Sequence, residues 1–157
     1  MAEKTPFDKE LLFLDELFFD REAFFEEMGR RLAAKGLVKD SFGKALSERE
    51  IVYPTGLATE PYPVALPHTD VEHVLRECIS FVRFKYPVEF QHMGDPETLV
   101  RARFAFVMAI MEPQKQVKTL SNLIMMLSNQ EAMTALNETD DLDKIFSILS
   151  EALKGAD

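Results

Sequence analysis

The sequence contains no tryptophan, a single cysteine and only six glycines in 157 residues. Cys78 has no partner for an internal disulfide, which excludes a disulfide scaffold and a cysteine-based metal site. Its neighbours, residues 77–81, are typical of a strand and favour a buried structural thiol. No apolar run approaches the ~18 residues of a membrane span, and residues 1–5 lack the pattern of a signal peptide. The sequence therefore predicts a cytoplasmic protein that is not embedded in a membrane.

Positive charge is also scarce, because 18 Lys and Arg stand against 27 Asp and Glu, a formal net charge of -9. Such a surface repels polyanions, so nucleic acid is not expected as a partner. Hydrophobic residues make up 46% and charged residues 29%, the balance of an ordinary globular chain. The length suits one core, so we expect a single domain over residues 1–157.

Two helices are predicted in the first third of the chain. Residues 22–35 carry apolar side chains at helical spacing, with Asp20 as N-cap and Gly36 as a left-handed C-terminal residue. A second helix is expected over residues 41–50. The apolar segment 11–19 fits either a pair of strands or a docked turn.

The middle of the chain carries the strand signals. Four prolines between residues 53 and 67 require an extended or turning path, with a short strand at residues 64–66. Residues 78–86 alternate as a strand does. Residues 104–111 form an almost unbroken apolar run, typical of a strand buried on both faces.

Two further helices are expected towards the C-terminus. Pro113 suits the first turn of one, whose inward face is predicted to consist of Val117, Leu120, Ile124 and Leu127. The other is expected over residues 142–153, with Thr139 or Asp140 as its cap. This order predicts an α/β or α+β class, with a mixed β-sheet flanked by helices on both sides.

His68 is the most informative candidate residue. Residues 64–70 read as strand, rigid turn, histidine and helix cap, an order that exposes an imidazole at the end of a strand. Clefts form at such ends, and a helix N-terminus nearby favours an anion such as phosphate. A neutral imidazole is nucleophilic enough to accept a phosphoryl group. An arbitrary histidine is more often a hydrogen-bonded surface residue, and Asp70 fits a helix cap better than a group that orients the imidazole.

The other histidines, His73 and His92, are interpreted as structural or surface residues. His68 and His73 are five positions apart, which does not align them on one helical face, and no third ligand accompanies them. The chain also has no glycine-rich phosphate loop. No metal, nucleotide or other cofactor is therefore predicted.

A longer pattern surrounds His68. Glu48-Arg49-Glu50, then Pro54-Thr55-Gly56-Leu57, then Val64-Ala65-Leu66-Pro67-His68 resembles the stretch that holds the phosphorylated histidine in enzyme IIA domains of the sugar phosphotransferase system, of the fructose, mannitol, nitrogen and galactitol types. The likeness extends over nearly the whole chain, including residues 112–117 and the last amphipathic helix.

The resemblance implies a phosphotransferase with a phosphohistidine intermediate. His68 would accept phosphate on Nε2 from the phosphocarrier protein HPr and donate it to a cysteine of enzyme IIB, which works with the membrane IIC permease. Arg49 would steady the phosphate, in keeping with the match between a guanidinium fork and phosphate oxygens. From the sequence alone, an arginine between two glutamates fits a solvated ion-paired residue better.

Gln114 stands where the mannitol and fructose types carry a second active-site histidine. Galactitol-like members are also glutamine-rich here, which favours that branch. Gln114 is either a weak contributor to the phosphate site or a residue of the first helical turn. Two other roles remain open, a nitrogen-type regulatory IIA protein that binds a regulator and an inactive relative. The sequence does not identify the sugar.

Overall fold

The computed structural model describes residues 7–154, so residues 1–6 and 155–157 of the predicted domain, including the N-terminal pattern considered above, lie outside the described residues. The elements in chain order are β1 (Phe7–Glu16), α1 (Arg21–Ala34), α2 (Phe42–Val52), β2 (Gly56–Leu57), β3 (Val64–Ala65), the 3-10 turn η1 (Val71–His73), β4 (Cys78–Gln91), β5 (Leu99–Ala109), α3 (Pro113–Leu127), α4 (Gln130–Glu138) and α5 (Leu142–Lys154).

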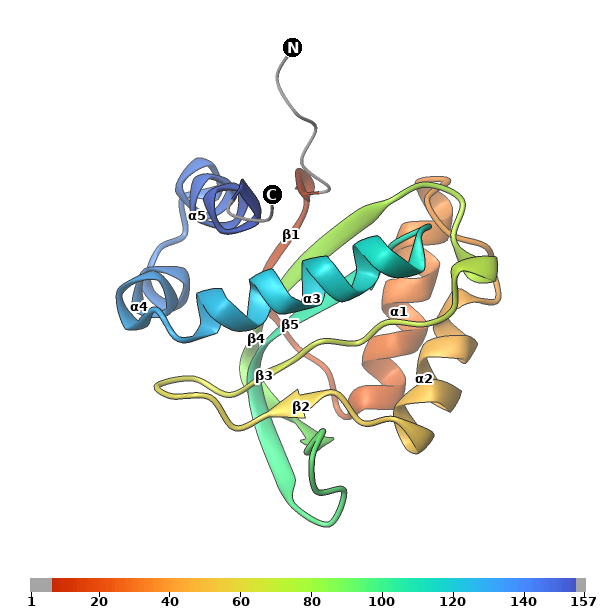
Figure 1. Cartoon of the computed structure of the whole chain (residues 1–157), viewed down its shortest axis with the longest axis horizontal. Coiled ribbons are helices and arrows are strands. Elements are labelled where there is room, and N and C mark those ends of the chain that lie inside the picture. Colours follow the sequence, from red (N-terminus) through yellow and green to blue (C-terminus); the bar gives the residue numbers. More distant parts are fainter. Residues whose placement is uncertain (1–6, 155–157) are drawn as a thin grey trace.

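The strands form one five-stranded sheet in the order β1-β4-β5-β3-β2 (Figure 1). The outer pair β1 and β4 is parallel, as is the pair β3 and β5. The pairs β4 and β5, and β2 and β3, are antiparallel. The sheet is therefore mixed, as predicted.

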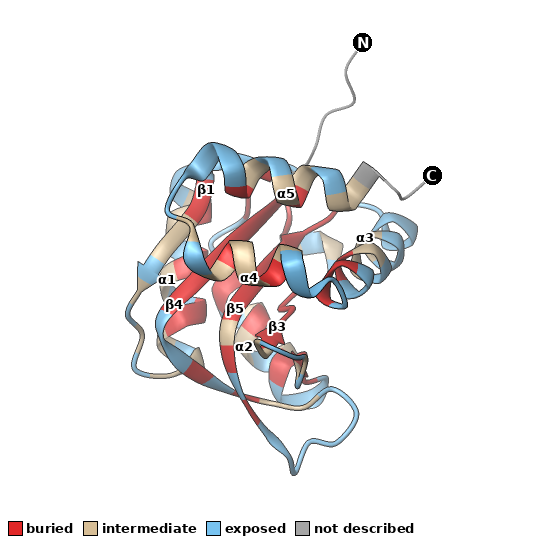
Figure 2. Cartoon of the chain, turned by 90° about the vertical axis from the view of Figure 1, so that its left-hand side faces the viewer, coloured by how far each residue is buried: buried red, intermediate tan, exposed pale blue. Residues whose placement is uncertain are grey.

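Strand β5 shows why both faces of the sheet need a cover. Phe104, Phe106 and Met108 join one apolar cluster, while Ala105 and Val107 join the other. This alternation follows from the two-residue period of a strand, which directs neighbouring side chains to opposite faces. Figure 2 shows the buried residues concentrated in the sheet and on the helix faces that meet it.

Helices cover both faces, which confirms the predicted class. The cluster with Ala105 and Val107, the first cluster, unites the sheet with α1 and α2. The cluster with Phe104, Phe106 and Met108, the second cluster, unites it with α3, α4 and α5 (Figure 1). At the start of α1 the Asp20 carboxylate accepts a hydrogen bond from the amide of Ala23 at 2.9 Å. After its end, Gly36 has a φ of 74°. Both predicted ends of this helix are thus confirmed.

Two strands run further than predicted. Of residues 11–19, for which two alternatives were open, residues 11–16 belong to the single strand β1, which begins at Phe7 and pairs with β4 at the edge of the sheet. Strand β4 continues past Pro87 to Gln91. A register shift between Arg83 and Val88 interrupts the ladder there, so the missing amide hydrogen of Pro87 is tolerated.

The inward face predicted for α3 was partly wrong. Val117 and Ile124 are 69% and 39% exposed, whereas Leu123 and Leu127 are buried and Leu120 packs against the same cluster. The helix is rotated so that residues at positions i, i+3 and i+7 face the sheet. The two apolar stripes overlap in sequence, and packing against the sheet selects one of them.

The C-terminal region contains a helix that the sequence reading missed, α4, capped by the Asn129 side chain, which accepts from the amide of Ala132. The cap predicted for the last helix was also wrong by one residue. The Asp141 carboxylate accepts from the amides of Asp143 and Lys144, so it holds the first turn of α5 in place of Thr139 or Asp140.

Candidate functional site

His68 lies where the segment after β3 runs beside the end of β5. Val64 pairs with Phe104 of β5, and the parallel contact reaches His68, which bridges to Met108. The amide of Met108 donates to the carbonyl of Pro67 at 3.0 Å. Pro67 has a fixed φ, so this bond holds the backbone immediately before the histidine rigidly against the sheet.

His68 is more buried than predicted. Its residue exposure is 9%, in place of the exposed imidazole expected at a strand end. The neighbouring strand β5 and the first turns of α3 approach this segment, and the Gln116 side chain donates to the carbonyl of Thr69 at 3.3 Å. Elements distant in sequence thus remove most of the imidazole from water.

The hydrogen bonds of His68 define which ring nitrogen carries the proton. Nδ1 lies 2.8 Å from the carbonyl oxygen of Leu66, and a carbonyl can only accept, so Nδ1 must be the donor. In the neutral ring Nε2 then carries the lone pair. Nε2 is accordingly the nucleophilic atom of this side chain.

The surroundings also keep the ring neutral. Burial lowers the pKa of His68, the hydrogen bond to Leu66 opposes this, the positive charge of Arg49 lowers the pKa further, and Asp70 acts in the opposite sense. The net shift is downward from the usual value of 6.5. A neutral, nucleophilic imidazole is therefore the prevailing form at neutral pH.

Arg49 in the last turn of α2 lies beside that lone pair. Its Nη2 atom is 3.4 Å from Nε2 of His68, the long end of a hydrogen bond. Its Nε atom is buried and has no hydrogen-bond partner within residues 7–154. Nε and Nη2 form one edge of the planar guanidinium, the fork that binds two oxygens of an anion. The ring of Tyr53, 4.9 Å from the guanidinium carbon, supports the side chain.

Two residues that the sequence reading did not assign lie behind the histidine. The carboxylate of Glu50 is buried and accepts from the amide of Thr55 at 2.6 Å and from its hydroxyl at 2.9 Å. The Thr55 hydroxyl in turn accepts from the amide of Leu66 at 3.2 Å. Both residues belong to the motif that carried the resemblance, but only their contacts in the fold connect them to His68.

Gly56 completes this motif because the chain passes very close to the neighbouring strand. A Cβ atom on Gly56 would lie 2.6 Å from the carbonyl oxygen of Gln91. The carbonyl of Gly56 accepts from the amide of Met93 at 2.8 Å. Glycine at this position lets the Thr55 segment lie against β4.

Of the two glutamines near the start of α3, Gln116 contacts the segment around His68, whereas Gln114 was the predicted candidate. Gln114 is exposed, and among the described residues it has no hydrogen bond to His68 or Arg49. Gln116, two positions later, is the one that reaches the Thr69 carbonyl. Leu57 and Tyr62, which precede His68 in the sequence, pack against the second apolar cluster.

The remaining candidates have structural roles. Asp70 makes no side-chain capping bond, and the segment after it is the three-residue turn η1, so the predicted helix cap is wrong. His73 contacts the Ser41 hydroxyl at 2.8 Å, and His92 accepts from the amide of Gly94. Cys78 is buried, as predicted, and burial raises its pKa to about 12.

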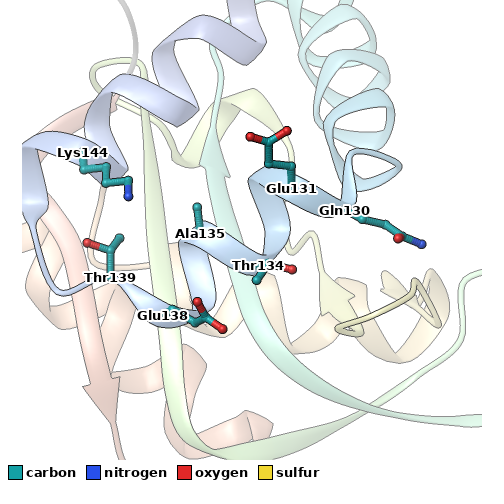
Figure 3. A pocket seen from close by; sticks show the side chains of 7 residues that line it. All are labelled: Gln130, Glu131, Thr134, Ala135, Glu138, Thr139 and Lys144. Carbon is teal, nitrogen blue, oxygen red and sulfur yellow. The ribbon is translucent and has the colours of Figure 1, made fainter.

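The rest of the described chain offers no comparable site. Residues 7–154 contain no group of three or more metal-ligating side chains, and none of their helices has the length and apolar character needed to cross a bilayer. The pocket in Figure 3 is lined by seven residues of α4, α5 and the turn between them, and they include no histidine, cysteine or arginine. The arrangement of His68 and Arg49 remains the one suited to group transfer.

A nucleophilic nitrogen beside a positive fork suits an electrophile that carries negative charge. The Nε2 lone pair can attack phosphorus while the guanidinium offsets the charge on the phosphoryl oxygens. The proton stays on Nδ1, hydrogen-bonded to the Leu66 carbonyl, so the ring can later leave phosphorus as a neutral imidazole. The geometry thus supports both acceptance and donation of a phosphoryl group.

Comparisons with known proteins agree with this chemistry. The family described as "Phosphoenolpyruvate-dependent sugar phosphotransferase system, EIIA 2" matches residues 5–152. The galactitol-specific EIIA component of Escherichia coli K12 is 30% identical over 119 residues, which are 76% of this chain and 79% of that protein.

Solved structures share the fold. Enzyme IIA mannitol of Escherichia coli, in its complex with phosphorylated enzyme IIB mannitol, has a TM-score of 0.73 at 24% identity, covering 92% of this chain and 99% of that one. Nitrogen regulatory protein IIA of Neisseria meningitidis has a TM-score of 0.69 at 22% identity, covering 91% and 95%. The family match over almost the whole chain and the galactitol-specific relative lead to one conclusion: the chain belongs to the EIIA 2 family of the phosphoenolpyruvate-dependent sugar phosphotransferase system.

Proposed function

We propose that His68 accepts a phosphoryl group on Nε2 from phospho-HPr and transfers it to a cysteine of an enzyme IIB of the galactitol-like branch. The observation that carries this proposal is the Nδ1 hydrogen bond to Leu66, which leaves a lone pair on Nε2 beside the Arg49 fork. The role is cytoplasmic and serves uptake through a membrane IIC permease.

The first transfer breaks the bond between phosphorus and the HPr imidazole and forms the bond between phosphorus and His68 Nε2. The second transfer breaks that bond and forms a bond from phosphorus to the IIB cysteine sulfur, which attacks as the thiolate, and His68 leaves as a neutral imidazole. In the first step the residues of this chain position the nucleophile, and in both steps they stabilise charge, with Arg49 beside the transferred group. Neither step requires an oxidant or reductant.

The galactitol branch is favoured by the 30% identity with the galactitol-specific component and by glutamine at position 114. A regulatory role of the nitrogen type is the second candidate, with the Neisseria structure as its support in fold. The two roles differ in the fate of the phosphate, since only the transport component needs to pass it to a IIB cysteine.

Phosphorylation with phosphoenolpyruvate, enzyme I and HPr tests the first transfer. We expect an acid-labile phosphate on the wild-type chain and none on His68→Ala, whereas His73→Ala and His92→Ala remain competent. An unmodified wild type, under conditions that phosphorylate a control IIA domain, would show that the carrier function is wrong. Phosphate retained by His68→Ala would show that the site is elsewhere.

The second transfer is tested with the phosphorylated chain and purified IIB proteins. We expect phosphate to move to a galactitol-type IIB faster than to a mannitol-type IIB, and not to a IIB whose cysteine is replaced by serine. If no IIB accepts the phosphate while the chain itself is efficiently phosphorylated, the regulatory role replaces the transport role.

A further inference from the structure

Hydrogen bonds through Thr55 and the backbone of Leu66 connect a buried carboxylate to the imidazole of His68. Glu50, 3% exposed, accepts from both the amide and the hydroxyl of Thr55, which is 2% exposed. The same hydroxyl accepts from the amide of Leu66 at 3.2 Å, and the carbonyl of Leu66 accepts from Nδ1 of His68 at 2.8 Å. Each donor named here therefore has an acceptor.

The Thr55 hydroxyl is well suited to its place in the middle. A hydroxyl has one proton and two acceptor sites, so it donates to the carboxylate and accepts from the Leu66 amide at the same time. The backbone carbonyl of Thr55 lies 3.3 Å from the same amide. Leu66 is therefore held from the side of Thr55 by two acceptors.

Leu66 is also held on its other side. The carbonyl that accepts the hydrogen bond from His68 Nδ1 belongs to the peptide bond with Pro67, and the carbonyl of Pro67 accepts from the amide of Met108 in β5. The ring of Pro67 restricts φ, so the direction of the Leu66 carbonyl depends on where residue 66 itself is placed. Thr55 contacts the amide of residue 66 directly, and Glu50 in turn holds Thr55.

Fold stability alone is a poor reason for a carboxylate at this position. Burial raises the pKa of Glu50 to about 7 despite the hydrogen bonds from Thr55 and the charges of Arg21 and Arg49. Burial of a charged group costs free energy, which its hydrogen bonds must offset. A carboxyl at this position is therefore better explained by what its hydrogen bonds hold in place than by its own burial.

We propose that Glu50 and Thr55 are positioning residues, which hold Leu66 so that its carbonyl keeps the proton of His68 on Nδ1 and leaves Nε2 free to react. This inference rests on the proposed function of His68 as a phosphoryl carrier. When the Leu66 carbonyl is displaced, the ring can place its proton on Nε2, and that tautomer has no lone pair with which to attack phosphorus.

The same positioning acts in the second transfer. With Nδ1 protonated, cleavage of the bond from phosphorus to Nε2 releases a neutral imidazole. With Nδ1 deprotonated, the same cleavage would release an imidazolate anion, a far poorer leaving group. The Leu66 carbonyl thereby favours both the acceptance and the donation of phosphate.

The test compares Thr55→Val with Thr55→Ser. Valine keeps the shape of threonine without the hydroxyl, and serine keeps the hydroxyl. Imidazole ¹⁵N NMR of the unphosphorylated chain measures the two tautomers of His68, and the rate of phosphorylation by phospho-HPr is measured in parallel. Thr59→Val is the matched control, because its hydroxyl donates to the Tyr62 carbonyl in the same loop and has no contact with His68.

We expect wild type, Thr55→Ser and Thr59→Val to hold the proton on Nδ1. Thr55→Val is expected to show a substantial Nε2-protonated fraction and a phosphorylation rate lower by roughly tenfold, the equivalent of one hydrogen bond. Glu50→Gln replaces one acceptor oxygen with a donor, so its tautomer fraction and rate are expected between those of wild type and Thr55→Val.

A folded Thr55→Val with the wild-type tautomer and a rate within twofold of wild type would overturn the inference. If Thr55→Val fails to fold, Thr55→Ala removes the same hydroxyl with less crowding and is judged by the same two measurements. Glu50→Gln with wild-type tautomer and rate would remove Glu50 from the proposal. The NMR measurement needs no phosphate. A wild-type chain that is never phosphorylated would therefore contradict the carrier function, while the NMR spectra would still show whether Thr55 and Glu50 set the tautomer of His68.

Discussion

The Nη2 atom of Arg49 lies 3.4 Å from the Nε2 atom of His68, and the neighbouring Nε atom of Arg49 is buried without a hydrogen-bond partner within residues 7–154. A guanidinium cannot accept a hydrogen bond, so this approach requires an unprotonated Nε2. The contact and the Leu66 carbonyl thus select the same tautomer from opposite sides of the ring.

Replacement of Arg49 tests the fork directly. Arg49→Lys keeps the charge and loses the second donor, so we expect the phosphorylation rate to fall about tenfold, and about a hundredfold in Arg49→Ala. Initial rates with phospho-HPr measure both. Lys44→Gln removes an exposed charge from the same helix and serves as the control. A Lys variant as fast as wild type would mean that charge alone, and not the two-donor geometry, is what the phosphate needs.

The pH dependence of phosphorylation follows from the lowered pKa of His68. The reactive form is neutral, so the rate should stay constant as pH falls to the usual histidine value of 6.5 and decline only below it. The unfolded chain takes up this proton at higher pH than the folded chain does, so the group's contribution to stability is present above pH 6.5 and is lost as pH falls towards the folded pKa. A pH-rate profile and an NMR titration of His68 in folded and urea-unfolded protein measure both effects. A folded-state midpoint above the unfolded one would contradict the expectation.

The elements of this fold were largely readable from local pattern, because Asp20, Gly36 and the alternation in residues 78–86 act within a few positions of the chain. The inward face of α3 was not readable, since two apolar stripes overlap and only the sheet selects one. The short helix α4 was missed for a related reason, because nine residues offer a single pair of inward positions, Met133 and Leu136.

His68 was a candidate from its own flanking residues, but its pairing with Arg49 was predictable only through the resemblance. Arg49 and His68 are 19 positions apart, on a helix and after a strand, and no spacing rule brings such residues together. The burial of His68 depends on β5 and α3, which follow it in the chain. Glu50 and Thr55 look like an ordinary helix end and turn until the fold places Leu66 against them.

Gly56→Ala is expected to destabilise the protein by about 1–3 kcal/mol, because its Cβ would lie 2.6 Å from the Gln91 carbonyl oxygen in a strand that cannot easily move. Urea unfolding measures the change. Gly94→Ala is the matched control, since the nearest atoms to its Cβ are side-chain atoms of His92 at 3.5 Å. Equal stability of the two variants would show that β4 yields locally at Gln91.

Gln114 can be distinguished from Gln116 by substitution. Gln114 is exposed, so Gln114→Ala should lower the phosphorylation rate by less than about threefold. Gln116→Ala removes the donor to the Thr69 carbonyl beside His68 and should have the larger effect. Initial rates with phospho-HPr provide the measurement. A tenfold loss in Gln114→Ala would instead assign this side chain to the phosphate site.

Glu50 should give the protein a pH dependence opposite in sign to that of His68. Burial raises the pKa of its carboxyl from 4.5 to about 7, so the folded chain binds this proton more tightly than the unfolded chain does. Its stabilisation is fully present below pH 4.5 and is lost as pH rises to about 7. At about 1.4 kcal/mol for each unit, the loss is on the order of 3 kcal/mol.

The difference between wild type and Glu50→Gln isolates this contribution, because glutamine does not titrate and His68 is present in both. Urea unfolding at pH values between 4 and 8 should show the stability of Glu50→Gln rising relative to wild type as the pH increases. Glu48→Gln, an exposed neighbour on the same helix, should show no such trend. A stability difference that is constant with pH would mean that Glu50 keeps the same charge in the folded and unfolded chains. In that case the burial of Glu50 would not make the stability depend on pH.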